Sequence, residues 1–247
     1  MISIKSEREI ALMREAGRRN ALVLNEVAKH IKAGITTKKI DEIVASKVKE
    51  LGCIASTLGY EGYPASVCVS VNDEVVHGIP GKRVIKNGDI VKVDLVVSYQ
   101  GYCADATRTF IIGDVSDEIK NLVQDTKDAF YAGVSVIKDG IRVCDVSRAI
   151  ENYAHSHGLS VVRELCGHGI GSSMHEEPDI TNFDDGNHTR LKAGMTIAIE
   201  PMLNLGKRDV YLCDDEWTVK TLDGLPSAHY ENTVLVTKDG YEILTGD

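Results

Sequence analysis

Four acidic residues of this sequence lie inside apolar runs typical of β-strands, where a carboxylate is rarely buried unless it is paired. Asp94 follows GDIVKV, Asp105 lies in YCADATRTF, Glu200 ends MTIAIE and Glu231 opens ENTVLVT. One such residue alone is most simply an edge-strand charge that points to solvent. Four of them together favour a buried cation site.

The first two acids are predicted to face each other in one β-hairpin. The flanking runs are rich in Val, Ile, Tyr and Thr, which favours strands. A two-residue turn at residues 99–100 places Asp94 directly opposite Asp105, where like charges destabilise a sheet. We therefore expect a proton, a basic partner or a metal cation to offset this repulsion.

A histidine in a glycine-rich loop is the candidate neutral ligand. His168 in ELCGHGIGSSMHEEP has a glycine on each side, which lets the backbone approach a crowded site closely. The glycines do not fit the dinucleotide-binding pattern G-x-G-x-x-G, and HEEP lacks the second histidine of H-E-x-x-H. A lone histidine of this kind is more often structural, so its assignment as a ligand depends on the acids.

Charge balance favours two divalent ions over one. Two such ions neutralise four carboxylates, and a bridging hydroxide then leaves one negative charge, whereas a single ion leaves a costly excess. Oxygen-rich ligation with one imidazole suits Mn²⁺, Fe²⁺, Co²⁺ or Zn²⁺, and the lack of thiolate ligands argues against a structural zinc. Two ions that share a water indicate a hydrolase.

Composition excludes several other classes of function. The 247-residue chain has a net charge of −9, which disfavours direct nucleic-acid binding. It has no apolar run near the roughly 20 residues of a membrane span and no signal-peptide pattern at its start. Its six scattered cysteines show no C-x-x-C spacing, which indicates a reducing cytoplasm.

The elements that must position these residues fall into two similar blocks. Segments 31–52 and 137–158 align without a gap at an offset of 106 residues, and the same offset places Glu200 on Asp94. We predict one domain, residues 1–247, made of two related α/β halves that share a central site. The expected elements are a helix around 10–24, a helix over 37–51, strands over 64–112, helices over 117–157 and strands thereafter, with the halves at about 1–113 and 114–247.

In this order and setting, the acids and His168 resemble the metal ligands of the methionine aminopeptidases. The resemblance extends over essentially the whole chain, through SVNDEVVHGIPG (70–81), CGHGIG (166–171), HEEP (175–178), IEPM (199–202) and EWTVKT (216–221). It implies an α/β (α+β) "pita-bread" fold with pseudo-two-fold symmetry and a central antiparallel sheet flanked by helices. It also implies a metallo-aminopeptidase that removes the initiator methionine from nascent proteins and peptides, favoured when the second residue is small.

The resemblance implies a role for each metal ligand. Asp94 would hold one divalent ion (Co, Mn, Fe, Zn or similar) and His168 with Glu200 the other, while Asp105 and Glu231 would bridge both. Glu200 would also carry the proton during hydrolysis. A weaker implication is a monovalent cation held by backbone near residues 72 and 227, which are Asn72 and Ser227.

Catalytic and substrate-binding residues are implied in the same way. His175 would donate to the scissile carbonyl, and His77 would contact the substrate backbone and the tetrahedral centre. Either histidine alone is more often a packing or surface residue. The residues implied to bind substrate are Tyr60, Tyr63, Cys68, His77, Met174, His175 and Trp217. Thr57 and Met174 stand where bacterial relatives more often have Cys and Phe, which predicts a looser methionine slot.

Two further segments, 182–190 and 205–216, also depart from the family pattern, and we expect them near the mouth of the site. The short bacterial type I form is expected, because the chain lacks a Cys-rich N-terminal extension and a long insertion between His175 and Glu200. The family implies a monomer in the cytoplasm that meets peptide N-termini of new proteins at the ribosome.

Two alternatives stay open. A proline-directed peptidase, such as aminopeptidase P or prolidase, shares the metal set but usually carries an extra N-terminal domain, and a tyrosine-lined pocket fits methionine better. A metal-free binding protein on the same fold belongs to another class, and the presence of all five ligands argues against it.

Overall fold

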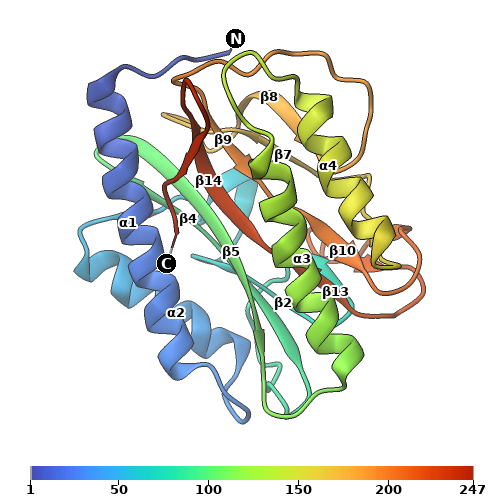
Figure 1. Ribbon diagram of the computed structural model, residues 1–247. Coiled ribbons are helices and arrows are strands. Elements are labelled where there is room, and N and C mark those ends of the chain that lie inside the picture. Colours follow the sequence, from blue (N-terminus) through green and yellow to red (C-terminus); the bar gives the residue numbers. More distant parts are fainter. Residues whose placement is uncertain (1, 247) are drawn as a thin grey trace.

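The computed structural model describes residues 2–246 (Figure 1). Its α-helices are α1 (Glu7–His30), α2 (Thr37–Glu50), α3 (Asp117–Ser135) and α4 (Val143–Ser156). Its strands are β1 (Ile54–Ala55), β2 (Cys68–Val71), β3 (Glu74–Val76), β4 (Ile90–Tyr99), β5 (Tyr102–Ile111), β6 (Ser160–Val161), β7 (Cys166–Gly169), β8 (Glu176–Thr181), β9 (Thr196–Ile199), β10 (Met202–Asn204), β11 (Val210–Leu212), β12 (Val219–Thr221), β13 (Ser227–His229), β14 (Glu231–Val236) and β15 (Tyr241–Ile243). No helix within residues 2–246 is long and apolar enough to cross a membrane.

The central sheet brings strands from both ends of the chain together. Its order is β1-β4-β5-β14-β9-β7-β8, with β15 on β14 and β2 on β4, and the pairings recorded between these strands are antiparallel. Figure 1 shows the early helices α1 and α2 on one side of the picture and the later helices α3 and α4 on the other. The five strands that carry or precede the expected ligands are neighbours in this order.

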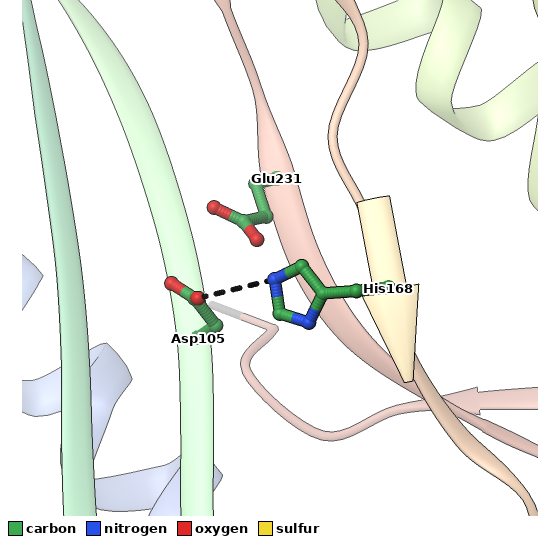
Figure 2. Close-up of side chains that lie close together, drawn as sticks. All are labelled: Asp105, His168 and Glu231. Atoms are coloured by element: carbon green, nitrogen blue, oxygen red, sulfur yellow. Dashed lines mark ion pairs between the residues drawn. The ribbon is translucent and has the colours of Figure 1, made fainter. Parts of the chain in front are cut away.

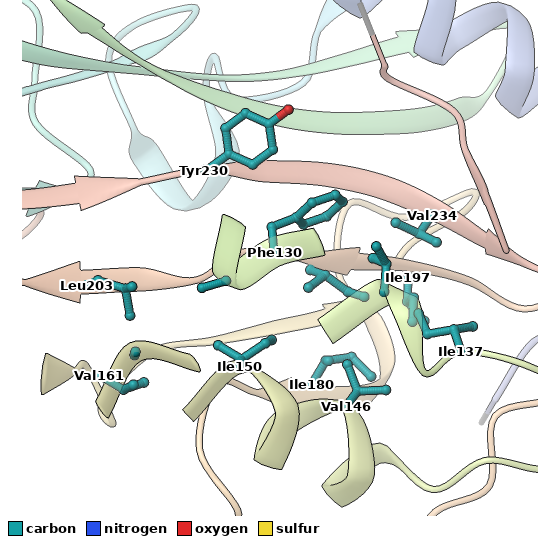
Figure 3. Close-up of a cluster of buried hydrophobic side chains, with 14 of the residues drawn as sticks. Phe130, Ile137, Val146, Ile150, Val161, Ile180, Ile197, Leu203, Tyr230 and Val234 are labelled. Atoms are coloured by element: carbon teal, nitrogen blue, oxygen red, sulfur yellow. The ribbon is translucent and has the colours of Figure 1, made fainter. Parts of the chain in front are cut away.

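Alternation along these strands separates a core face from a site face. Val93 and Leu95 of β4 pack in one apolar cluster with residues of α1 and α2, so Asp94 between them points to the opposite face. Ile197 and Ile199 of β9 pack in a second cluster with α3 and α4, shown in Figure 3 around Phe130 and Ile150. The apolar positions that build the two cores therefore aim the acids at a shared opposite face.

The hairpin register differs from the prediction. Tyr99 pairs with Tyr102, so Asp94 lies opposite Thr107 and Asp105 lies opposite Val96. The turn is residues 100–101, with φ of 49° and 85°. A two-residue hairpin turn with positive φ at both positions prefers glycine at the second, which moves the turn one residue along from 99–100. Asp94 and Asp105 still share a face, as diagonal rather than opposed neighbours.

The two halves make matching backbone contacts at the predicted offset of 106 residues. The N–H of Gly34 donates to Ile85 and the N–H of Gly140 donates to Leu191, each at 2.8 Å. Both glycines have a left-handed φ, of 95° and 86°, which side chains disfavour. Further matched contacts are the bridges 36–84 and 142–190 and the hydrogen bonds from Thr37 to Arg83 and from Val143 to Thr189. The boundary near residue 113 stays a prediction.

An ion pair ties the segment before α1 to the first residue of β8, next to His175. Lys5 Nζ lies 2.7 Å from Glu176 Oε2, and both side chains are largely buried. The other carboxylate oxygen of Glu176 accepts from the backbone N–H of Ser173 at 3.3 Å. The Lys5 backbone N–H donates to Gly194 at 2.8 Å. The start of the chain thus helps to fix the wall of the site.

Candidate metal centre

The central sheet brings together all five predicted ligands. Asp94 is on β4, Asp105 on β5, His168 on β7, Glu231 at the start of β14, and Glu200 directly follows β9. Figure 2 shows the side chains of Asp105, His168 and Glu231 pointing toward one another from three strands. Each of these three offers a ligand atom within 4.8 Å of the others. The convergence follows from strand order and alternation rather than from sequence proximity.

Short distances link the histidine to the carboxylates. His168 Nε2 lies 3.9 Å from Asp105 Oδ2 and 3.6 Å from Glu200 Oε1. Asp105 and Glu231 are 5% and 2% exposed, so their carboxyl groups have little access to water. Asp105 Oδ1 has no hydrogen-bond partner among residues 2–246. A buried acid with an orphan oxygen, beside an imidazole and further acids, fits a divalent cation site.

The tautomer of His168 suits a ligand. Its Nδ1 lies 2.8 Å from the carbonyl oxygen of Gly169 and donates to it, which leaves the Nε2 lone pair facing the carboxylates. Burial and the nearby His175 lower the pKa of His168 to about 4, so the ring is neutral. A Cβ at Gly167 or Gly169 would collide with the carbonyls of Ala198 and Glu177, which confirms the close backbone approach expected there.

Burial raises the pKa of every acid in the cluster. The pKa of Asp94 rises to about 6, and that of Asp105 rises well above its usual range through burial and then through the charges of Glu231 and Asp94. Burial and then the charges of Glu231 and Asp94 raise the pKa of Glu200, and burial and then the charge of Asp94 raise the pKa of Glu231. Thr107 Oγ1 donates to Glu231 Oε2 at 2.8 Å, which orients that carboxylate. Burial thus favours the protonated forms of Asp105, Glu200 and Glu231, and a divalent cation at this site would replace those protons.

The two predicted catalytic histidines border the same space. His175 Nδ1 lies 2.8 Å from the Tyr60 hydroxyl, and its ring stacks edge-on to His168 with centroids 4.3 Å apart. His77 adopts a φ of 59°, which is unusual for a residue with a side chain and typical of functional sites. Burial lowers the pKa of His77 to about 4.

A cavity of about 790 Å³ opens onto the ligand cluster. Its floor includes all five ligands, and all seven residues expected to bind substrate line it: Tyr60, Tyr63, Cys68, His77, Met174, His175 and Trp217. Tyr63 and Trp217 meet edge-on at 4.9 Å, and the Tyr63 hydroxyl donates to Gly78 at 2.9 Å, which fixes one wall. Thr57 lines the cavity as well, whereas segments 182–190 and 205–216 contribute no lining residue.

One buried histidine next to the cluster was missed from the sequence. His229 is 1% exposed, and its Nε2 lies 4.0 Å from Glu200 Oε2 and 4.0 Å from Glu231 Oε2. Burial lowers its pKa to about 3. A signal was present, because the i, i+2 spacing to Glu231 places both side chains on the same side of an extended chain.

A lysine occupies the place where a monovalent cation was expected. Lys92 Nζ donates to the carbonyl oxygens of Asn72 at 2.7 Å and Ser227 at 2.9 Å. The side chain is buried, and burial lowers its pKa to about 7. Lys92 lies two residues before Asp94 on β4 and therefore on the same face of the sheet.

Comparison with known proteins matches residues 11–238 to the family model for metallopeptidase family M24. The chain is 46% identical over 246 residues to methionine aminopeptidase 1 of Bacillus subtilis, covering 99% of each chain. It superimposes with a TM-score of 0.98 on crystal structures of methionine aminopeptidase from Rickettsia prowazekii and Thermotoga maritima, at 40% and 43% identity and full coverage of both chains. The prolidase from Pyrococcus furiosus shares the fold at a TM-score of 0.80 and 22% identity, and the match covers 99% of this chain and 65% of that one.

Proposed function

Because this chain belongs to metallopeptidase family M24, with the bacterial type I methionine aminopeptidases, we propose that its five candidate ligands bind two divalent cations. We also propose that its substrates are nascent proteins whose second residue is small. The expected pita-bread fold is confirmed by the superpositions. The enzyme is a metallo-aminopeptidase that removes N-terminal methionine. The observation that carries the two-ion proposal is the set of four buried acids around one neutral imidazole.

The donor set supports a different role for each of the five ligands. Asp94 would hold one cation, His168 and Glu200 the other, and Asp105 and Glu231 would bridge them. When bound, such cations lower the pKa of a shared water and polarise the substrate carbonyl. Glu200 would accept the proton of that water and return it to the leaving amine, since burial already favours its protonated form.

His175 is the proposed donor to the scissile carbonyl. Burial raises the pKa of Tyr60, so its hydroxyl stays protonated and would donate a hydrogen bond to His175 Nδ1. The lowered pKa of His175 keeps the ring neutral. A neutral imidazole that accepts at Nδ1 carries its proton on Nε2, and Nε2–H is then the group that donates to the carbonyl.

The apolar cavity wall supports a slot for methionine. Tyr63 and Trp217 provide rigid aromatic surfaces, and Cys68 and Met174 add polarizable sulfur, which packs well against a thioether. His77 lies 6.4 Å from Trp217 between ring centroids and would contact the substrate backbone beside the cluster. We attribute the preference for a small second residue to crowding next to the cations.

The cellular setting is part of the proposal. All six cysteines are free, which suits a reducing cytoplasm. We place the enzyme there, as a monomer that meets new protein N-termini at the ribosome. For the monovalent cation expected near Asn72 and Ser227, the contacts favour another occupant, because Lys92 already donates to both carbonyls.

Cleavage assays with and without a chelator test the proposal. The purified protein with Mn²⁺ should release methionine from Met-Ala-Ser, and EDTA should abolish the activity until Mn²⁺ is restored. Elemental analysis should find two Mn²⁺ per chain at saturation. Absence of cleavage both with Mn²⁺ and with EDTA would support the metal-free binding protein, and cleavage of an X-Pro peptide alone would support a proline-directed peptidase.

A further inference from the structure

His229 is held firmly by its backbone at the edge of the ligand cluster. It ends β13 and pairs with Met202 of β10, two residues after Glu200. The hydroxyl of Thr109 donates to the His229 carbonyl at 2.7 Å and accepts from the His229 N–H at 3.1 Å. The backbone therefore has little freedom, and the ring direction is set by the strand.

The imidazole of His229 has no hydrogen bond in the described chain. Both ring nitrogens are buried and lack a partner among residues 2–246. The recorded neighbours of Nε2 are Glu200 Oε2 and Glu231 Oε2, each at 4.0 Å, which is too long for a hydrogen bond but within reach of a small side-chain shift. Buried polar atoms normally have a hydrogen-bond partner, so two unpaired ring nitrogens indicate a functional role for His229.

Glu200 lies between two imidazoles. Its Oε1 faces His168 Nε2 at 3.6 Å, and its Oε2 faces His229 Nε2 at 4.0 Å. Glu231 also faces His229, through the same Oε2 that accepts from Thr107 Oγ1 at 2.8 Å. One imidazole nitrogen thus faces a carboxylate oxygen of each glutamate.

We propose that His229 is a positioning residue whose Nε2–H donates to the carboxylates of Glu200 and Glu231 and so orients both for cation binding. The inference rests on the proposed function, because both glutamates are cation ligands only there. Hydrogen bonds from such outer groups to ligand side chains fix their orientation and raise metal affinity. His229 acts through the glutamates and needs no contact with substrate.

Three substitutions separate donation at Nε2 from mere packing. Glutamine places its amide nitrogen where histidine has Nε2, asparagine places its amide nitrogen where histidine has Nδ1, and leucine fills the space without a donor. We expect calorimetric titration of Mn²⁺ into the metal-free protein to give His229→Gln an affinity within about threefold of the parent. His229→Asn and His229→Leu should bind Mn²⁺ at least about tenfold more weakly.

Kinetics on Met-Ala-Ser provide a second readout. At subsaturating Mn²⁺, His229→Asn and His229→Leu should have a lower kcat than the parent with little change in KM. His229→Gln should have a kcat close to that of the parent. Asn204→Leu is the matched control, because Asn204 is buried in the same small sheet, and the hydrogen bond recorded for its side chain within residues 2–246 goes to the Lys207 carbonyl at 3.0 Å. This control should lower the unfolding temperature without weakening Mn²⁺ binding.

The outcomes distinguish the inference from the function on which it rests. Equal Mn²⁺ affinity in the parent, His229→Asn and His229→Leu would overturn the positioning role, as would equal losses in His229→Gln and His229→Leu. A loss in Asn204→Leu as large as in His229→Leu would also overturn it, since loosening of the sheet would then suffice. Failure of the parent to bind Mn²⁺ would instead refute the proposed metal centre.

Discussion

The hydroxyl of Tyr60 lies 2.8 Å from Nδ1 of His175, and donation by this hydroxyl would leave the imidazole proton on Nε2. The two residues are 115 positions apart, one in the turn before β2 and the other in the loop after β7. The contact therefore joins two residues of the cavity lining, one proposed to bind methionine and the other proposed to donate to the scissile carbonyl.

Tyr60→Phe should lower kcat about tenfold and leave KM for Met-Ala-Ser nearly unchanged. The ring still fills the slot, but His175 loses the partner that holds its proton on Nε2, and a lost hydrogen bond of this kind costs about 1.4 kcal/mol in the transition state. Steady-state kinetics at saturating Mn²⁺ measure kcat and KM separately. Tyr241→Phe, at an exposed site, is the control, and a rise in KM alone would contradict the role assigned to the hydroxyl.

Asp105→Asn should bind less metal than the parent and lose at least about a hundredfold in kcat/KM. The change removes a charge that both cations would share, and the amide cannot bridge as a carboxylate does. Elemental analysis after dialysis gives the metal content. His168→Ala should also abolish turnover while the unfolding temperature of the metal-free protein stays close to that of the parent. Equal metal content in Asp105→Asn and in the surface control Asp117→Asn would rule out the bridging role.

Activity should not depend on the monovalent cation of the buffer. Lys92 Nζ already donates to the two carbonyls that would bind such an ion. Rates in NaCl, KCl and tetramethylammonium chloride at equal ionic strength should agree within about twofold. Lys92→Met should lose about 1–3 kcal/mol of stability, because two buried carbonyls lose their donor. A parent enzyme that needs K⁺ would show that the ion displaces the lysine.

Glu9→Gln should destabilise the protein more at pH 6 than at pH 3. Backbone and side-chain hydrogen bonds from Ser6, and then the bond from Tyr102, lower the pKa of Glu9 to about 2. A carboxylate with a depressed pKa stabilises the fold above its unfolded pKa, near 4.5, and this contribution is lost as pH falls toward 2. Urea unfolding of the metal-free protein at both pH values measures whether the loss of stability is larger at pH 6 than at pH 3. Glu7→Gln, in the same turn, is the comparison.

Sequence alone predicted that the five candidate ligands converge, because strand alternation and the 106-residue repeat depend on residue type and spacing. The hairpin register was wrong because it depends on which two residues take positive φ, and Gln100 is an uncommon choice for the first. His229 and Lys92 were not assigned. His229 had a signal in its two-residue spacing to Glu231, whereas the contact of Lys92 with Ser227 spans 135 positions and is revealed only by the folded sheet.

The repeat has a consequence for how the enzyme can be divided. Asp94 and Asp105 come from the first half of the sequence, and His168, Glu200 and Glu231 come from the second. Neither fragment could assemble a working centre by itself, since each would contribute an incomplete set of ligands. A chain cut between β5 and α3 would regain activity only if its two pieces reassociated, so hydrolysis would become dependent on protein concentration.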